Sequence, residues 1–411
     1  MDETALPLPY EEPAHLGFHP VRLRRITEVF ERDTIKGAIP GAVILVARRG
    51  RIAYVNTVGF QDATLKTPMR VDSIFRIASM TKPVTCVAAM CLAEEGEFPL
   101  ATPISRYIPE FAEIKVATET DVEGEPSLSF DRPRSEIMIQ DLMRHTSGMT
   151  YGHFGDSLVH RKYRELEMMN PYQTNEEMVQ KLCTLPLRYH PGTTFEYGMS
   201  VDVLGRVVEI VSGLALNTFV TERILKPLGM RDTSFGLAAE KHERLALPFP
   251  EFVSSLESAC ANPLTPQPRW QSGGGGMLST APDYLRFALM LLKSGELNGT
   301  RILAPETIKF MTSNHLPPAV EFGSTIGMFC SVAPTPQMGQ GFGLGFAVRT
   351  ARGQNPDMGS VGLFYWPGIS GCAFWVDPPQ ELAVVLMLQA PTVRAHYRSL
   401  LRNLVYQALL D

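Results

Sequence analysis

The hydrophobic pattern of the first hundred residues predicts a helix, a hairpin and a second helix. Apolar side chains recur at helical spacing over residues 21–36. Two β-rich runs, 42–47 and 52–58, flank a polar turn at 48–51, which is typical of a β-hairpin. The run RIASMTKPVTCVAAMCL, from Arg76 to Leu92, is almost wholly apolar. It predicts a buried helix that ends near Gly96.

From residue 101 to about 268 the strand-like alternation mostly disappears. Helical patches lie at 139–144, 175–185, 200–212 and 219–224, separated by proline and glycine. The stretch 118–135 is polar, and we expect an exposed loop there. This block is therefore expected to be mainly helical.

Strand patterns return in the last third of the chain. The segment GGGGMLSTAPDYLRFALMLLKSGEL predicts a glycine turn leading into a helix, whose start is marked by Thr280, Pro282 and Asp283. Strand-like runs follow at 343–349, 372–377 and 382–388, and a final helix is expected at 393–410. We predict an α/β plus all-α fold: an antiparallel sheet flanked by helices, formed by residues 1–98 and 269–411, with an inserted helical domain at 99–268. The cleft between the two domains is the expected ligand site.

Composition and charge narrow the class of protein. With 411 residues, 45% hydrophobic and 20% charged, the chain is expected to be a soluble globular protein. A net charge of -5 and the absence of a basic run argue against nucleic-acid partners. The opening MDETALPLPYEEP lacks the features of a secretory signal, and no apolar run is long enough to span a membrane. We therefore expect a cytoplasmic protein without a membrane partner.

Cysteine and histidine spacing gives no sign of a metal or a disulfide framework. The six cysteines are scattered without a CxxC pair, and the nine histidines show no ligand spacing. Buried free thiols, no metal and no cofactor are the expectation.

The candidate chemistry begins with Ser79 and Lys82. Positions three apart share a helix face, so both side chains point the same way. The positive end of the helix and partial burial disfavour the charged form of Lys82, and a neutral lysine can accept the serine proton. Ser79 is also expected to cap the helix. The alternative is an ordinary N-cap serine followed by a solvated lysine, because the bare spacing often arises by chance.

Two further segments can complete such a site. Tyr197, in PGTTFEYGMSVDVLG, is a candidate general acid/base, although a tyrosine there can also be a plain core or rim aromatic. The segment LFYWPGISGCAFWVDP offers a glycine-rich entry to a strand, where a backbone amide can approach a ligand; the alternative is a bulged edge strand, which would suit Pro367. No serine has glycines at both minus two and plus two, which argues against the α/β-hydrolase fold.

The ordered motifs SMTK, HTSGM, YGMS, GGGGMLST and a W-x-G segment resemble the serine β-lactamase/penicillin-binding-protein superfamily. Class C β-lactamases, family VIII carboxylesterases and fungal-type acyltransferases are the most similar branch. The resemblance implies an α/β domain with an all-helical insertion. It also implies roles for the matched residues: Ser79 as nucleophile, Lys82 as its activating partner, Tyr197 as general acid/base, and Trp366, Gly368 and the amides of Ser79 and Ile369 as the substrate-binding and oxyanion elements.

Two departures from the β-lactamase pattern bear on the substrate. Met199 stands where β-lactamases carry an asparagine, and Trp366 stands where a strand lysine would meet the carboxylate of the antibiotic. We expect an apolar wall without a cationic anchor, which suits a neutral ester or acyl thioester. The predicted function is a carboxylesterase for short-chain esters of small molecules. An acyltransferase, a β-lactamase, a D-amino-peptidase or amide hydrolase, and a non-catalytic binding protein are the alternatives.

Overall fold

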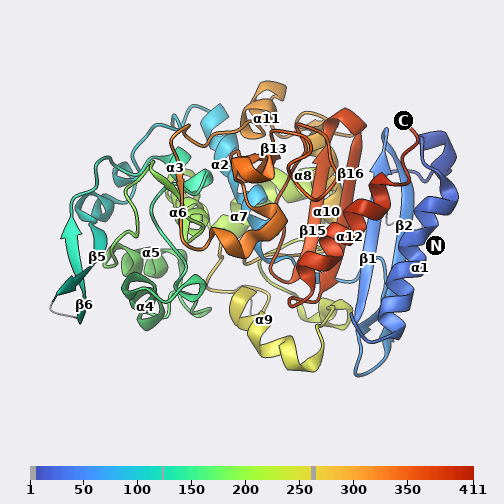
Figure 1. Cartoon of the computed structure of the whole chain (residues 1–411), viewed down its shortest axis with the longest axis horizontal. Helices are drawn as coiled ribbons and strands as arrows, with labels where there is room; N and C mark the ends of the chain where they lie inside the picture. Colours follow the sequence, from blue (N-terminus) through green and yellow to red (C-terminus); the bar gives the residue numbers. More distant parts are fainter. Residues whose placement is uncertain (1–5, 123–124, 261–264) are drawn as a thin grey trace.

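An eight-stranded antiparallel sheet forms the centre of the computed structural model, which describes residues 6–122, 125–260 and 265–411 (Figure 1). The first five residues, part of the N-terminal segment interpreted above, lie outside the described chain. Strand order in the sheet is β12-β13-β14-β15-β16-β1-β2-β3, so the two ends of the chain build it together. The predicted antiparallel sheet is thus confirmed. Its strands are β1 (Gly41–Arg48), β2 (Arg51–Asp62), β3 (Thr67–Pro68), β12 (Gln340–Phe342), β13 (Ala347–Arg349), β14 (Phe364–Tyr365), β15 (Gly371–Asp377) and β16 (Leu382–Gln389).

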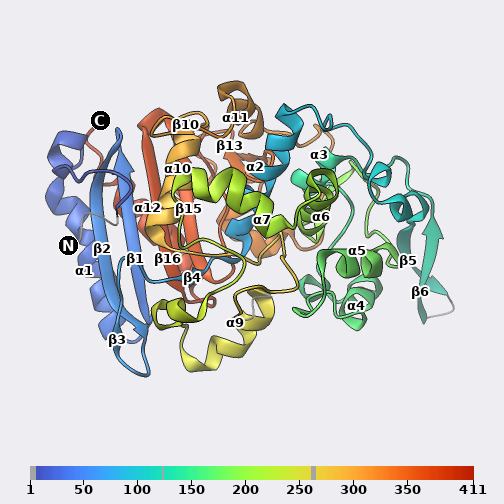
Figure 2. The same ribbon diagram turned by 180° about the vertical axis from the view of Figure 1, so that it is seen from behind.

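Helices cover both faces of the sheet, which explains why β1 and β16 are buried along their whole length. The helices α1 (Pro20–Ile35) and α12 (Arg394–Tyr406) lie on one face, and α10 (Ala281–Leu292) lies on the other (Figures 1 and 2). The predicted β1–β2 hairpin is present, with Arg49 and Gly50 at positive φ in its turn. The two ends of the chain meet beside it, where the Leu410 amide donates to the Gly17 carbonyl at 2.9 Å.

On the side of α2 (Thr81–Glu94) away from the sheet lie α3, α4, α5 and α6, and α2 packs against α6 and α7 (Figure 2). The helix bounds are α3 (Ile139–Met143), α4 (Leu158–Glu165), α5 (Asn175–Cys183), α6 (Ser200–Ser212), α7 (Leu216–Val220), α8 (Lys226–Leu228), α9 (Val253–Cys260) and α11 (Pro305–Met311). The patches predicted at 139–144, 175–185 and 200–212 correspond to α3, α5 and α6, and the patch at 219–224 spans the end of α7 and the π-helical turn Thr221–Leu225. The helices α4, α9 and α11 were not predicted. The exact division of the chain at 98/99 and 268/269 into two domains stays a prediction.

Two local predictions differ from the structure. The polar stretch 118–135, expected to be a loop, forms most of the hairpin β5 (Val116–Val122) and β6 (Glu125–Asp131). Most of its side chains face water on both sides, so the sequence lacks the apolar alternation that would reveal a strand. The strand expected at 343–349 begins only at Ala347, because the Gly343 amide donates back to the Phe346 carbonyl in a turn.

Three short strand pairs of the described chain lie outside the large sheet, and the first two join segments that are far apart in the sequence. They are β4 (Phe75–Arg76) with β8 (Leu278–Ser279), β7 (Thr194–Phe195) with β11 (Glu321–Phe322), and β9 (Glu296–Leu297) with β10 (Thr300–Arg301). Among the described residues, no single helix has the length and apolar composition to cross a membrane; only α6 taken with α7 and α8, bent by 80°, meets those criteria as a pair.

Candidate active site

Ser79 is the one accessible residue in a buried segment. Every other residue from Ser73 to Leu92 is buried, whereas Ser79 is half-exposed. It lies in a 3-10 turn, Ala78–Met80, directly before α2. Ala78 has a φ of 47°, and the Thr81 hydroxyl donates to its carbonyl at 2.7 Å. This left-handed, hydrogen-bonded turn presents the Ser79 side chain to solvent.

The predicted N-cap role of Ser79 is wrong. The residue preceding α2 is Met80, in a helical conformation, and no side chain caps that helix end. The extra 3-10 turn moves Ser79 two positions before the first helical residue. Its hydroxyl instead accepts a hydrogen bond from Lys82 Nζ at 3.4 Å.

Lys82 is buried, and its three ammonium protons have three acceptors. Besides Ser79, Nζ donates to the Gly274 carbonyl at 2.6 Å and to the Tyr151 hydroxyl at 3.2 Å. The same nitrogen lies 4.5 Å from the centre of the Tyr197 ring. Fixed acceptors and an aromatic face together offset the cost of burying this cation.

Tyr151 and Asp202 complete this network, and the sequence interpretation missed both. The Tyr151 hydroxyl donates to Asp202 Oδ2 at 3.1 Å, and the Gly274 amide donates to Asp202 Oδ1 at 3.1 Å. Burial, and then the Asp202 carboxylate, raise the pKa of Tyr151 well above its ordinary value. Tyr151 therefore stays a neutral phenol and is a poor candidate base. Its position two residues after the HTSGM motif was the available signal.

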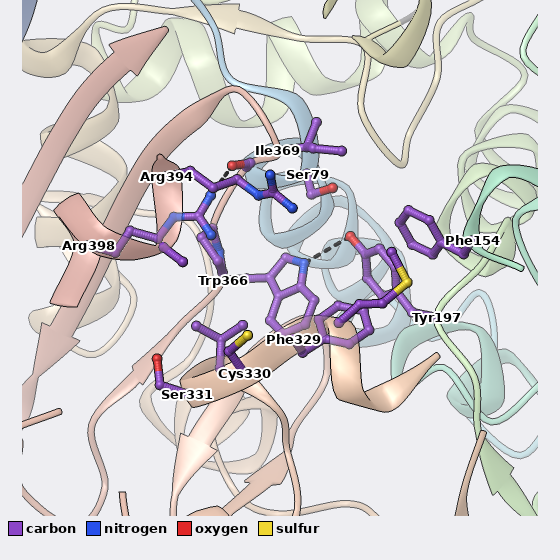
Figure 3. Close-up of a pocket in the computed structure, with 15 residues that line it drawn as sticks. Ser79, Phe154, Tyr197, Phe329, Cys330, Ser331, Trp366, Ile369, Arg394 and Arg398 are labelled. Atoms are coloured by element: carbon purple, nitrogen blue, oxygen red, sulfur yellow. Dashed lines mark hydrogen bonds between the residues drawn. The ribbon is translucent and has the colours of Figure 1, made fainter. Parts of the chain in front are cut away.

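Tyr197 faces the same site from the turn before α6, as predicted. Trp366 Nε1 donates to the Tyr197 hydroxyl at 3.0 Å, which is the dashed line between these residues in Figure 3. This bond fixes the orientation of the Tyr197 hydroxyl oxygen in the site. His145 packs on the Tyr197 ring with 4.5 Å between ring centres, and Phe154 stacks parallel to that ring at 5.9 Å.

The segment from Trp366 to Ile369 lies against the turn that carries Ser79. A Cβ atom on Gly368 would stand 2.3 Å from the Ile77 carbonyl oxygen, so only glycine permits this approach. The Gly368 amide is already bonded to the Cys372 carbonyl at 2.9 Å. Within the described residues, the Ile369 amide has no hydrogen-bond partner. That free donor, beside Ser79, suits a developing oxyanion.

Two cavities meet at Ser79, Phe154, Tyr197 and Ile369. One is lined by aromatic residues and by the C-terminal helix, and Figure 3 shows it; it contains Met328, Phe329, Trp366, Pro367, Gly368, Arg394 and Arg398 among others. The second is lined by Tyr151, His153, Met169, Ser272, Gly274 and Gly275 among others. An ester bound at Ser79 can thus place its acyl and alcohol parts in separate cavities.

The residues that line these cavities correct the prediction of an apolar substrate wall without a cationic side chain. Trp366 and Phe329 do supply an apolar surface, and Met199 is fully buried outside both cavities. However, α12 adds two guanidinium groups, Arg394 and Arg398, to the first cavity. Sequence comparison at the strand motif could not reveal them, because they come from a helix about thirty residues further along the chain.

The cysteine expectation holds for most positions. Cys86, Cys91, Cys260 and Cys372 are buried free thiols and Cys183 is partly buried, but Cys330 is exposed on the wall of the first cavity. Among the residues that the structure describes, no cluster of three or more histidine, cysteine or acidic side chains is arranged to hold a metal ion.

Comparison with known proteins shows the family of the chain. The family model described as Beta-lactamase matches residues 26–407. The chain belongs to the β-lactamase family. It is 36% identical to Protein Rv1367c of Mycobacterium tuberculosis over 86% of each chain. It is 30% identical to Esterase EstB of Burkholderia gladioli, with 88% of this chain and 89% of the esterase covered.

A solved structure extends the likeness to the whole fold. EstCE1, described as a hydrolase with promiscuous acyltransferase activity, superposes with a TM-score of 0.75 at 26% identity, covering 94% of this chain and 99% of EstCE1. The chain is a serine hydrolase with the β-lactamase-like fold. Hydrolysis or transfer of esters through a serine-bound acyl intermediate is its reaction class.

Proposed function

We propose that the protein is a carboxylesterase that cleaves short-chain esters through an acyl-enzyme on Ser79. The observation that carries the proposal is the arrangement around one accessible serine: Lys82 Nζ lies 3.4 Å from its hydroxyl and 4.5 Å from the Tyr197 ring centre. Nucleophile, cation and candidate acid/base thus meet where two cavities join.

The first half of the reaction follows from these positions. Ser79 Oγ attacks the ester carbonyl while its proton passes to the hydroxyl oxygen of Tyr197, which acts as the base in its phenolate form beside the Lys82 ammonium group. The amides of Ser79 and Ile369 stabilise the oxyanion. Tyr197, whose oxygen is oriented by Trp366, then gives a proton to the leaving alcohol, and the acyl group remains on Ser79. Water repeats the sequence in reverse and releases the acid.

An acyltransferase is the second candidate, since it shares every step up to the acyl-enzyme. The likeness to EstCE1 and, at 27% identity over 74% of this chain, to Acyltransferase mokF of Monascus pilosus supports it. An esterase and an acyltransferase differ only in the nucleophile that attacks the acyl-enzyme, which is water in the first and an alcohol in the second. Adding methanol or glycerol during turnover separates them, because a transferase forms the new ester faster than free acid.

Hydrolysis of p-nitrophenyl butyrate and of nitrocefin, measured side by side, tests the proposal. We expect fast cleavage of the butyrate, little cleavage of nitrocefin, and no turnover of either by Ser79→Ala. Because Ser79 caps no helix, that variant should retain its stability to within about 0.5 kcal/mol. Ser324→Ala, at an exposed serine shortly before the Met328–Val332 wall of the first cavity, is the matched control and should keep full activity.

Two outcomes would overturn the assignment. Turnover that persists in Ser79→Ala would remove Ser79 as nucleophile. Faster cleavage of nitrocefin than of the butyrate would make the protein a β-lactamase. A labelled fluorophosphonate that tags Ser79 in the absence of ester cleavage would favour the transferase instead.

A further inference from the structure

Two arginines on one face of α12 line the cavity that contains Ser79. Arg394 and Arg398 are four residues apart, so their side chains share a helix face, and both are half-buried (Figure 3). Arg398 donates to the Gly368 carbonyl, and Arg394 donates to the Pro391 carbonyl. Arg398 Nε is buried without a partner. Within the described chain, neither guanidinium forms an ion pair with a carboxylate.

Three other arginines of low exposure have compensating partners, whereas Arg349, which is buried away from the cavity, has two guanidinium nitrogens without a partner among the described residues. Arg144 pairs with Asp141 at 2.9 Å, and Arg76 pairs with Glu257 at 3.1 Å. Arg402, the next arginine of α12, lies 4.5 Å from the Tyr365 ring centre and 5.0 Å from that of Trp375. Arg394 and Arg398 are different because they face an open cavity and each other.

The two guanidinium groups of Arg394 and Arg398 lack a negatively charged partner in the part of the chain that the structure describes. Burial, and then the like charge of Arg394, lower the pKa of Arg398 to about 9, which leaves it charged at neutral pH. Burial also lowers the pKa of Arg394. Two adjacent, partly desolvated cations without a counter-ion raise the free energy of the empty site, and a bound anion would lower it. Arginine suits this task because its fork binds a planar carboxylate with two parallel hydrogen bonds.

We propose that Arg394 and Arg398 bind a carboxylate of the substrate, so that the enzyme acts on small esters that carry a free acid group on one arm. This rests on the proposed function, since the arginines share their cavity with Ser79 and Tyr197. One carboxylate fits better than a phosphate. The rest of the wall is largely apolar, including Phe154, Phe329 and Trp366, and one N–H of Arg398 is already used by Gly368.

The anionic arm is confined to one side of the scissile bond. Arg394 and Arg398 belong only to the first cavity, whereas the second is lined by Tyr151, His153 and Met169 among others. Burial lowers the pKa of His153 to about 4, so this side chain adds no positive charge at neutral pH. The second cavity should therefore receive the uncharged arm of the ester.

Matched acid and methyl-ester substrates test the proposal. The first pair is mono-4-nitrophenyl glutarate and its methyl ester, with the charge on the acyl arm. The second pair is 4-carboxyphenyl butyrate and its methyl ester, with the charge on the alcohol arm. In one of the two pairs, the wild-type kcat/KM should favour the acid by about tenfold or more, as expected for a charged hydrogen-bonded pair.

Substitution of each arginine tests whether the preference for the acid substrate depends on Arg394 and Arg398. Arg394→Met and Arg398→Met should each lower the acid-to-methyl-ester ratio of that pair by about tenfold. Arg106→Met removes the same charge from an exposed position remote from the cavity, and its ratio should equal that of the wild type. Arg394 makes no bond to the Trp366–Ile369 segment, so Arg394→Met carries the test if Arg398→Met does not fold.

Different results would contradict the anion site and the proposed esterase function. Acid-to-methyl-ester ratios near or below one in both pairs, with Ser79-dependent cleavage of p-nitrophenyl butyrate, would overturn the anion site and leave the esterase intact. An acid preference that survives both arginine substitutions would overturn it as well. Loss of all ester cleavage in the wild type would instead overturn the proposed function, and this inference with it.

Discussion

Lys82 Nζ lies 3.2 Å from the hydroxyl oxygen of Tyr151, so a second tyrosine, besides Tyr197, is a direct neighbour of Lys82. Tyr151 in turn is fixed by Asp202, which also accepts hydrogen bonds from Ser272 and from the Gly274 amide. The nucleophile's partner is thus held by a chain of buried polar groups. Tyr151 and Asp202 act on Ser79 through Lys82, as positioning residues rather than as reacting groups.

Tyr151→Phe removes one of three acceptors of Lys82 and should let its ammonium group move away from Ser79. We expect kcat for p-nitrophenyl butyrate to fall by about 10- to 100-fold with little change in KM, because substrate contacts stay in place. Asp202→Asn should act in the same direction. Tyr163→Phe, which removes another buried phenol hydroxyl bonded to the Pro186 carbonyl, is the control and should keep its kcat. An unchanged kcat in Tyr151→Phe would show that Lys82 needs only Ser79 and Gly274.

Tyr197→Phe removes the proposed proton donor and acceptor. Its kcat should fall by about 100-fold or more, whereas KM should change little. Trp366→Phe keeps the ring but removes the N–H that orients the Tyr197 oxygen, so a smaller fall of about tenfold is expected. Trp375→Phe, on β15 beside Arg402, is the control tryptophan. Near-normal rates in Tyr197→Phe would move proton transfer to another group.

Gly368→Ala should move the Ile369 amide away from the Ser79 amide, so that the two proposed oxyanion donors no longer lie together. The new methyl group would meet the Ile77 carbonyl oxygen at 2.3 Å, and the backbone must shift because neither partner is a flexible side chain. We expect a fall in kcat of about 100-fold, comparable to the loss of one oxyanion donor. Gly327→Ala, where a Cβ atom meets nothing within 4 Å, is the matched control. Equal activity of the two variants would exclude the Gly368 segment from the oxyanion site.

We expect the stability of the protein to depend on pH through the buried carboxyl of Asp283, near the start of α10. Burial raises the pKa of this carboxyl from 3.8 to about 6. The folded state therefore binds more protons than the unfolded state between these values, so this group's contribution to the free energy of unfolding falls as pH rises through about 6. At pH 8 the ionised Asp283 should cost up to about 3 kcal/mol.

Asp283→Asn isolates that contribution. The amide oxygen can still accept from the Asp232 amide and the Thr233 hydroxyl, as Asp283 does in the wild type. The difference in unfolding free energy between variant and wild type, measured by urea titration, should move in favour of the variant between about pH 4 and about pH 6.5. A difference that is constant across this range would contradict the raised pKa of Asp283.

The sequence by itself determined the sheet, most helices and the positions of Ser79, Lys82 and Tyr197. Those features are local: apolar periodicity sets an element, and short ordered motifs mark chemistry that a few residue types can perform. The hairpin β5–β6 was not predicted, because both of its faces are exposed to water and its sequence therefore lacks the alternation of apolar and polar residues. The N-cap prediction for Ser79 failed over two residues, because helix ends are the least marked part of a pattern.

Only the tertiary structure decided what surrounds those residues. Tyr151 contacts Lys82 from the loop before the 3-10 turn Gly152–Phe154, and Asp202 on α6 holds Tyr151 in place. Arg394 and Arg398 enter the cavity from the last helix of the chain. None of these side chains is near Ser79 in the sequence. Tyr151 was marked only by its position two residues after the HTSGM motif, and no periodicity placed Asp202, Arg394 or Arg398 at the site. The packing of α12 across the sheet and beside the Trp366–Ile369 segment brings two cations to a pocket that the strand motif alone predicted to be uncharged.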